Sequence, residues 1–304
     1  MYDLVIIGSG PAGMAAAIYA KRACLKTLMI ERTGFGGGQV LNTYEVDNYP
    51  GLPGISGFEL AQKMSEHVSK MKAEIVEDDA ISIREDNGIY YITGENSTYE
   101  TKGIIIATGA KHAHLNVPGE EELSGMGVSY CATCDGAFFT GRDVAVVGGG
   151  DVAVEDAIFL ARNCRKVYLI HRRDELRAAK TLQEAVKQCD NVEILWNTTV
   201  EEIRGEDAVS SLVIKNKVTG EVDNLPVSGI FVAVGILPNS ECFKGFVNMD
   251  AAGYIEAGEE CMTSKPFVYA VGDVRTKPLR QVVTAVADGA NAVTAFQKDL
   301  LLHK

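Results

Sequence analysis

Residues 8–13 read Gly8-Ser9-Gly10-Pro11-Ala12-Gly13, and this stretch decides the expected fold. The apolar run Leu4 to Ile7 precedes it, an Ala-rich stretch to Ala23 follows it, and Thr27 to Ile30 is a second apolar run. Strand, glycine loop, helix and strand in this order form a βαβ unit. Its glycines permit a tight turn, close approach of the backbone to a pyrophosphate, and close packing of helix on strand. We therefore expect a bound nucleotide here.

Glu31 ends the second strand of this unit. An acidic side chain at that place suits a ribose hydroxyl and repels a 2′-phosphate. The alternative is a glycine turn with only a structural role, but the flanking strands and Glu31 favour a dinucleotide site.

The pattern recurs later in the chain. Val144 to Val147 predicts a strand, Gly148-Gly149-Gly150-Asp151-Val152-Ala153 the loop, the following residues a helix to about Arg162, and Val167 to Ile170 the next strand. The sequence thus contains two nucleotide-binding βαβ units, typical of an α/β protein.

The second unit ends differently from the first, because His171-Arg172-Arg173 stands where the first unit has Glu31, and Arg177 follows. Arginine binds phosphate in a bidentate manner, so this site is expected to prefer NADPH over NADH. A solvated basic cluster is the alternative interpretation.

Cys131-Ala132-Thr133-Cys134-Asp135 precedes the second loop and indicates a redox dithiol. A zinc site would need a second Cys or His pair, for which His112 and His114 are the only local candidates. No metal is expected. Thiol chemistry needs a proton donor and acceptor, and Asp135 is the candidate if burial raises its pKa. The alternative for Asp135 is a capping or turn residue.

Composition narrows the function further. The 304 residues are 46% hydrophobic and carry a net charge of -12, which argues against nucleic-acid or anionic-membrane partners. The chain shows no signal peptide and no apolar run long enough to span a bilayer, so we expect a cytoplasmic protein. The other five of the seven cysteines are expected to be mostly buried apolar residues: Cys24, Cys164, Cys189, Cys242 and Cys261.

Each nucleotide unit is expected to carry a β insertion, over Ile75 to Thr101 and over about Val200 to Leu225. Later segments read as buried strands with glycine turns and a closing helix: residues 104–110, 230–239, 267–273 and 281–304. Segments 111–118 and 235–243 contain Pro or Gly between apolar strands and would form a two-stranded hinge.

Taken together, these motifs closely resemble the low-molecular-weight bacterial thioredoxin reductases over the whole chain. The matching motifs are residues 8–13, Gly37-Gly38-Gln39, Thr43 to Gly51 with Asn48, Cys131 to Gly136, Gly148 to Ala153, His171 to Arg177, and Gly272-Asp273 with Arg280-Gln281. The resemblance implies two Rossmann-like three-layer domains, with an NADPH domain at 115–242 inserted in an FAD domain formed by 1–114 and 243–304.

The resemblance also assigns residues. It implies FAD binding by Gly8, Gly10, Gly13, Glu31, Gly38, Gln39, Asn48, Thr108, Gly109, Gly272, Asp273, Arg280 and Gln281. It implies NADPH binding by Gly148, Gly150, Ala153, His171, Arg172, Arg173 and Arg177. It places Cys134 on the flavin side and gives Cys131 the attack on the thioredoxin disulfide.

The implied activity is electron transfer from NADPH through FAD and the dithiol to thioredoxin, in a homodimer whose NADPH domain rotates between half-reactions. The chain departs from the resemblance at Val152, where Ser or Thr is usual, and at Asp156, where Glu is usual. Both could weaken NADPH binding. The alternatives are a related reductase that serves another carrier or takes electrons from ferredoxin, and a flavin-binding redox sensor.

Overall fold

The computed structural model describes residues 1–43, 46 and 48–302, and these form two compact units. Unit 1 comprises Met1–Lys111 and Leu237–Lys304, and unit 2 comprises His112–Ile236. The chain therefore leaves unit 1, forms unit 2 and returns. Within the expected FAD-binding motif Thr43 to Gly51, the residues Tyr44, Glu45 and Asp47 lie outside the described residues, as do the last two residues of the expected closing helix.

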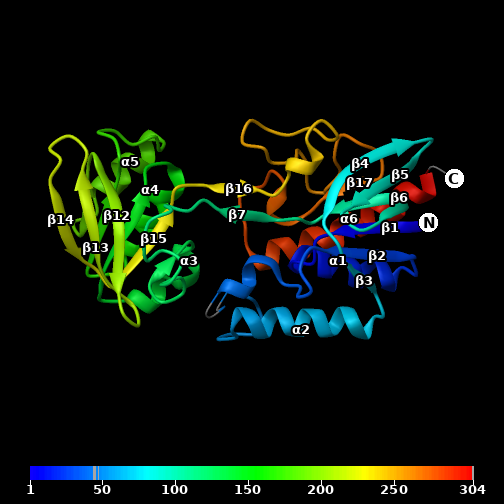
Figure 1. The fold of residues 1–304 in the computed structure, drawn as a ribbon, viewed down its shortest axis with the longest axis horizontal. Coiled ribbons are helices and arrows are strands. Elements are labelled where there is room, and N and C mark those ends of the chain that lie inside the picture. Colours follow the sequence, from blue (N-terminus) through cyan, green and yellow to red (C-terminus); the bar gives the residue numbers. More distant parts are fainter. Residues whose placement is uncertain (44–45, 47, 303–304) are drawn as a thin grey trace. The chain divides into compact units, whose positions relative to one another are not determined.

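Unit 1 is built on a parallel sheet with helices packed against it (Figure 1). Its strand order is β3-β2-β1-β6, with β17 paired to β6 on the far side. The buried residues of β1 are apolar throughout, as expected for a strand covered on both faces. The elements are β1 (Tyr2–Ile7), α1 (Pro11–Arg22), β2 (Thr27–Glu31), η1 (Gly38–Asn42), α2 (Gly57–Lys70), β3 (Glu74–Glu77), β6 (Thr98–Ile106), η3 (Glu241–Phe243), β17 (Val268–Ala270), η4 (Gly272–Val274) and α6 (Val282–Leu302).

Helices α1 and α6 pack closely because small residues face each other. A Cβ atom added at Gly289 of α6 would lie 2.2 Å from the carbonyl oxygen of Ala12 in α1. The N-terminal and C-terminal parts of the sequence thus share one core, which holds the first glycine loop in place.

An antiparallel extension continues the same sheet. Strands β4 (Ala80–Asp86) and β5 (Ile89–Gly94) form a hairpin, and β5 pairs with the first part of β6. Asn87 and Gly88 both have positive φ, 52° and 78°, which is the backbone of a two-residue hairpin turn. The sequence analysis assigned Ile75 to this insertion, but Ile75 lies in β3, which pairs in parallel with β2 through Met29. That detail of the insertion was wrong.

Unit 2 repeats the plan with a five-stranded parallel sheet in the order β11-β10-β9-β15-β8. A three-stranded antiparallel sheet, β12-β13-β14, is added to it, in the place expected for the second insertion. The elements are β8 (Val128–Ser129), α3 (Ala132–Asp135), η2 (Gly136–Phe139), β9 (Asp143–Gly148), α4 (Asp151–Ala161), β10 (Lys166–Ile170), α5 (Lys180–Lys187), β11 (Val192–Leu195), β12 (Thr198–Gly205), β13 (Val209–Asn216), β14 (Val222–Pro226) and β15 (Gly229–Ala233).

Two short strands carry the chain between the units. Strand β7 (Ala110–His112) and strand β16 (Ile236–Pro238) pair with each other as a two-stranded sheet. Strand β16 lies within the expected connecting segment 235–243, and β7 overlaps the start of the other, 111–118, but begins one residue before it. In the described part of the chain, no helix is long and apolar enough to cross a membrane.

Candidate functional site

The three glycines of the first loop have three different physical roles. Gly8 has φ 103°, and a Cβ there would lie 2.5 Å from the carbonyl oxygen of Ala107. A Cβ at Gly13 would lie 2.0 Å from the carbonyl oxygen of Gly8, so the helix can approach the loop only without a side chain. A Cβ at Gly10 would meet nothing within 4 Å. Gly10 therefore leaves open the space into which a pyrophosphate would fit.

Glu31 lies beside this loop at the carboxyl end of β2. Its carboxylate accepts hydrogen bonds from the backbone N–H of Ser9 at 2.9 Å and from the backbone N–H of Thr33 at 3.0 Å. The hydroxyl groups of both residues also donate to it. Glu31, Ser9 and Thr33 line a cavity of about 230 Å³. A carboxylate on the wall of a cavity at this loop suits a ribose hydroxyl.

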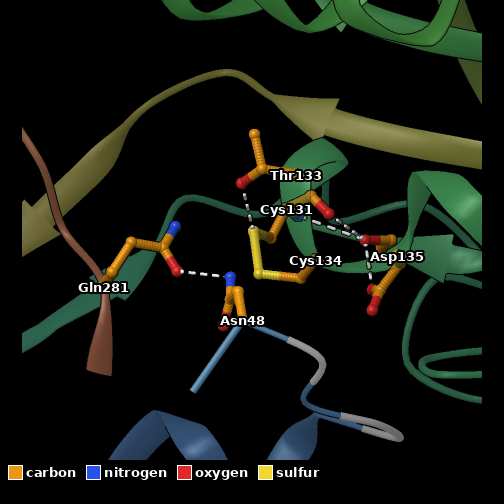
Figure 2. The surroundings of a disulfide bond; sticks show 7 residues. Asn48, Cys131, Thr133, Cys134, Asp135 and Gln281 are labelled. Carbon is orange, nitrogen blue, oxygen red and sulfur yellow. Dashed lines mark hydrogen bonds between the residues drawn. A yellow bond between two sulfur atoms is a disulfide. The ribbon is translucent and has the colours of Figure 1, made fainter. Parts of the chain in front are cut away.

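The next FAD-binding candidates extend from this loop. A Cβ at Gly38 would lie 3.5 Å from the Cα of Gly10, so the Gly38 backbone adjoins the glycine loop, and Gln39 follows in η1. Farther along the chain, the Asn48 amide donates to the side-chain oxygen of Gln281 at 3.0 Å (Figure 2). This bond joins two candidates 233 positions apart.

The turn after β6 is hydrogen-bonded to Asn239, in the segment where the chain returns to unit 1. The Thr108 hydroxyl donates to the carbonyl oxygen of Asn239 at 2.6 Å, and the Asn239 amide donates to the Thr108 carbonyl oxygen at 2.9 Å. The backbone N–H of Asn239 also donates to the Gly109 carbonyl oxygen. Asn239 is therefore a supporting residue for the Thr108-Gly109 turn, and the sequence analysis did not single it out.

Asp273 and Arg280 carry buried polar atoms without partners among the described residues, namely Asp273 Oδ1 and Arg280 Nε. Burial raises the pKa of Asp273. Buried polar atoms normally have hydrogen-bond partners, so these two fit a polar ligand such as the sugar chain or ring edge of a flavin nucleotide. With the open space at Gly10, they show that the residues present fit FAD.

A buried ion network holds the Gly272-Asp273 turn. The Asp288 carboxylate of α6 accepts the backbone N–H of Gly272 at 2.9 Å, and it pairs with Arg275 at 2.7 Å and Lys277 at 2.8 Å. The two cations hold the pKa of Asp288 below its usual value despite burial. No local sequence pattern marks this network, because Asp288 lies in α6 and its partners lie in or just after η4.

In the second loop, a Cβ at Gly148 would lie 2.4 Å from the carbonyl oxygen of Ala233, and a Cβ at Gly150 would meet nothing within 4 Å. The position of Gly13 is taken by Ala153, which is fully buried. A Cβ at Gly149 would lie 2.2 Å from the His171 ring. The open backbone at Gly150 offers the same kind of anion site as the first loop.

His171 is buried, whereas the three arginines that follow it in the expected NADPH site are exposed. His171 is only 4% exposed, its Nε2 is 2.9 Å from the Glu175 carbonyl oxygen, and burial lowers its pKa. A buried neutral ring suits support of the loop better than contact with a phosphate. Arg172, Arg173 and Arg177 are exposed, and none of the ion pairs within the described residues uses them.

The arginine segment is fixed to the glycine loop through its backbone. The N–H of Arg177 donates to the Gly149 carbonyl oxygen at 2.7 Å, and the N–H of Asn197 donates to the Arg173 carbonyl oxygen at 3.0 Å. Three exposed guanidinium groups beside an open glycine loop form a basic rim that fits a 2′-phosphate.

Cys131 and Cys134 form a disulfide with a Cα–Cα distance of 5.3 Å, at the start of the short helix α3. Both residues are half-buried, and the Thr133 hydroxyl lies 3.4 Å from Cys131 Sγ (Figure 2). The pair is thus accessible to a reductant or a second disulfide. Of the remaining cysteines, Cys164 and Cys261 are buried, Cys189 and Cys242 are half-buried, and Cys24 is exposed. Expecting all five to be mostly buried was wrong for Cys24.

Asp135 ends α3, and burial raises the pKa of its carboxyl group, as an acid/base role requires. The Ser129 hydroxyl donates to Asp135 Oδ2 at 2.6 Å, whereas Oδ1 is buried without a partner among the described residues. Sequence reasoning missed Ser129, although its position two residues before Cys131 was available as a signal.

The two departures from the expected motifs lie on α4, just after the second loop. Val152 is 55% exposed and Asp156 is partly buried. Burial, with a smaller contribution from Glu155, raises the pKa of Asp156 to about 7. Near neutral pH, Asp156 therefore carries only part of a negative charge.

These features define a class of protein: two glycine-loop nucleotide units in one chain, with a redox disulfide. Residues 2–289 match the pyridine nucleotide-disulphide oxidoreductase family, and the chain belongs to this family.

Its relatives make the group more specific. The chain is 48% identical to the thioredoxin reductase of Peptoclostridium acidaminophilum, over 98% of this chain and 96% of that one. It is also 48% identical to the thioredoxin reductase of Listeria innocua, over 98% and 93%. The crystal structure of the Streptococcus pyogenes thioredoxin reductase superposes with a TM-score of 0.94 at 46% identity, over 99% of both chains. The predicted resemblance to the low-molecular-weight bacterial thioredoxin reductases, which use FAD and NADPH, is confirmed.

Proposed function

We propose that this chain reduces the disulfide of thioredoxin at the expense of NADPH, with FAD in unit 1 and NADPH in unit 2. The observation that carries the proposal is the half-buried Cys131–Cys134 disulfide next to Asp135, in the unit that also contains the second glycine loop. The relatives named above support thioredoxin as the substrate.

We assign FAD to unit 1 and NADPH to unit 2 from the residues at the two glycine loops. In unit 1, the Gly8, Gly10 and Gly13 loop would hold the pyrophosphate, and Glu31 would accept hydrogen bonds from a ribose. In unit 2, Gly150 would leave room for the pyrophosphate, and Arg172, Arg173 and Arg177 would bind the 2′-phosphate. When bound, the two nucleotides supply hydride transfer and deliver two electrons to the disulfide.

The dithiol then acts on thioredoxin. The Cys131 thiolate attacks one sulfur of the thioredoxin disulfide, and the leaving thiolate takes a proton from Asp135. Cys134 returns a proton to Asp135 and attacks the Cys131 sulfur, which re-forms the Cys131–Cys134 disulfide and releases reduced thioredoxin. The raised pKa of Asp135 supports this role, because a higher pKa increases the fraction of carboxyl group that can give a proton to the leaving thiolate.

The nicotinamide and the dithiol both have to reach the same flavin, although both belong to unit 2. We therefore propose that unit 2 rotates about the connectors β7 and β16 between half-reactions. An engineered crosslink between the units should abolish multiple turnover and leave a single half-reaction. Full steady-state turnover of the crosslinked enzyme would disprove the rotation.

A homodimer and a cytoplasmic location belong to the same proposal. The five free cysteines support a reducing compartment. Sedimentation of the purified protein at several concentrations tests the dimer.

Thioredoxin-dependent oxidation of NADPH tests the activity itself. We expect turnover with thioredoxin to exceed that with a glutaredoxin or a peroxiredoxin-reducing carrier, and no support from reduced ferredoxin. Equal or faster turnover with another carrier would contradict the proposal that thioredoxin is the substrate.

Asp135→Asn tests the acid/base role, because it keeps the size of the side chain and removes the exchangeable proton. We expect roughly 100-fold slower reduction of thioredoxin and little change in flavin reduction by NADPH. Stopped-flow measurement of both half-reactions distinguishes the two. Equal slowing of both would reject the role.

A further inference from the structure

Ser129 occupies the junction between the dithiol and its acid. It is buried, and it lies in β8, where it pairs with Phe231 of β15. Its backbone is therefore part of the parallel sheet of unit 2 and is well fixed. The side chain projects from this support toward the two functional groups that follow it in the sequence.

The Ser129 hydroxyl bridges those groups. It accepts the backbone N–H of Cys131 at 3.1 Å and donates to Asp135 Oδ2 at 2.6 Å. Its other acceptor, the Cys131 carbonyl oxygen, is farther away at 3.4 Å. Because a hydroxyl has a single proton, the shorter bond to the carboxyl group is the one that is made. The bond that the hydroxyl accepts strengthens the one that it donates.

We propose that Ser129 is a positioning residue for Asp135: its hydroxyl holds one carboxyl oxygen in place and leaves the other available for proton exchange with the dithiol. This inference rests on the proposed function, since it assigns Ser129 a role in the same half-reaction. The buried Oδ1 atom, which has no partner among the described residues, is the oxygen left to exchange the proton.

The electrostatics agree with this geometry. Burial raises the pKa of Asp135, and the Ser129 hydrogen bond opposes that rise. Ser129 therefore keeps the carboxyl group able to lose its proton as well as to hold it, which a relay between two thiols requires. Loss of the hydroxyl would move the pKa of Asp135 farther upward and leave its side chain free to rotate.

Ser129→Ala is the direct test, with Ser129→Thr as the rescue that keeps the hydroxyl. In Ser129→Ala, the limb of the pH profile for thioredoxin reduction that reports Asp135 should move upward by about one pH unit. Reduction of the flavin by NADPH should be unchanged. Ser129→Thr should restore the parental profile, and Ser210→Ala, an exposed serine of the same unit, should match the parent.

A double-mutant cycle separates positioning from general damage. If Ser129 acts through Asp135, Ser129→Ala should have less than about a twofold effect in the Asp135→Asn background. An effect of the same size in both backgrounds would overturn the proposal. If Ser129→Ala does not fold, Ser129→Gly takes its place in the same cycle.

Carbon-13 NMR titration of the aspartate carboxyl groups gives a readout that does not depend on thioredoxin. An upward shift for Asp135 in Ser129→Ala supports the positioning role even if another carrier is the substrate. An unchanged Asp135 titration in a variant that folds would overturn it, whether or not the chain reduces thioredoxin.

Discussion

The first and second glycine loops share a backbone plan and differ at the residues that face a ligand. Gly8 and Gly148 both abut a carbonyl oxygen of the neighbouring strand end, and Gly10 and Gly150 both leave open space. The loops therefore offer a pyrophosphate the same kind of site.

The two units differ in the residue at the end of the strand that follows each loop helix. In the first unit, the second loop position is Ser9, whose hydroxyl and N–H donate to Glu31. In the second, that position is Gly149, whose missing side chain leaves room for the buried His171 ring. The residue at this loop position is thus matched to the residue at the end of the next strand. The shared backbone offers both loops an open site for a phosphate, and we propose that the residue at the strand end selects the nucleotide.

The largest effect is expected at Gly13, the glycine that lets helix α1 pack against the first loop. Gly13→Ala places a Cβ about 2.0 Å from the Gly8 carbonyl oxygen, so the helix and loop of unit 1 must separate. We expect a loss of about 3 kcal/mol in the free energy of unfolding and loss of bound FAD. Thermal unfolding and flavin content measure both.

Ala153→Gly is the reciprocal change in unit 2. Since Ala153 already fits there, the expected cost is about 1 kcal/mol, and NADPH binding should persist. Equal effects of the two substitutions would show that the loops do not differ in packing.

The arginine rim is the next target. Replacing Arg172, Arg173 and Arg177 with Ala should raise the KM for NADPH roughly 100-fold and leave the KM for NADH nearly unchanged, because only NADPH carries the 2′-phosphate. Arg142→Ala, an exposed arginine of the same unit, is the control. If the KM values for both nucleotides rise together, the arginines do not select the nucleotide.

A smaller effect on NADPH binding is expected at Gly149, the second residue of the second glycine loop. Gly149→Ala forces the His171 ring to move, and with it the arginine segment that is bonded to the Gly149 carbonyl oxygen. The KM for NADPH should rise roughly tenfold with kcat retained. Gly258→Ala, at an open position of unit 1, should have no effect. An unchanged KM in Gly149→Ala would mean that the His171 contact is not needed for binding.

Secondary structure could be predicted from the sequence where residues close together in the chain determine it. The βαβ order around Gly8 and around Gly148 follows from the local spacing of apolar runs and glycines, and the structure shows these elements where they were predicted. Strand β3 was misassigned because its four residues, Glu-Ile-Val-Glu, are mostly exposed and lack the continuous apolar run of a buried parallel strand, although it pairs in parallel with β2.

The missed parts of the site depend on tertiary contacts. The Asp288 network joins α6 to the Gly272 turn, and Asn239 joins the returning chain to Thr108. No local pattern marks either pairing. His171 was assigned to NADPH binding because arginines follow it in the sequence. In the structure its ring is buried against Gly149, and a linear motif carries no information about that contact.

The most direct test of the account is the absorbance of the flavin during anaerobic addition of nucleotide and then of thioredoxin. The account predicts that NADPH bleaches the flavin band much faster than NADH at equal concentration, and that oxidised thioredoxin restores the band. It would be contradicted if NADH were as effective as NADPH, or if oxidised thioredoxin left the reduced flavin unchanged.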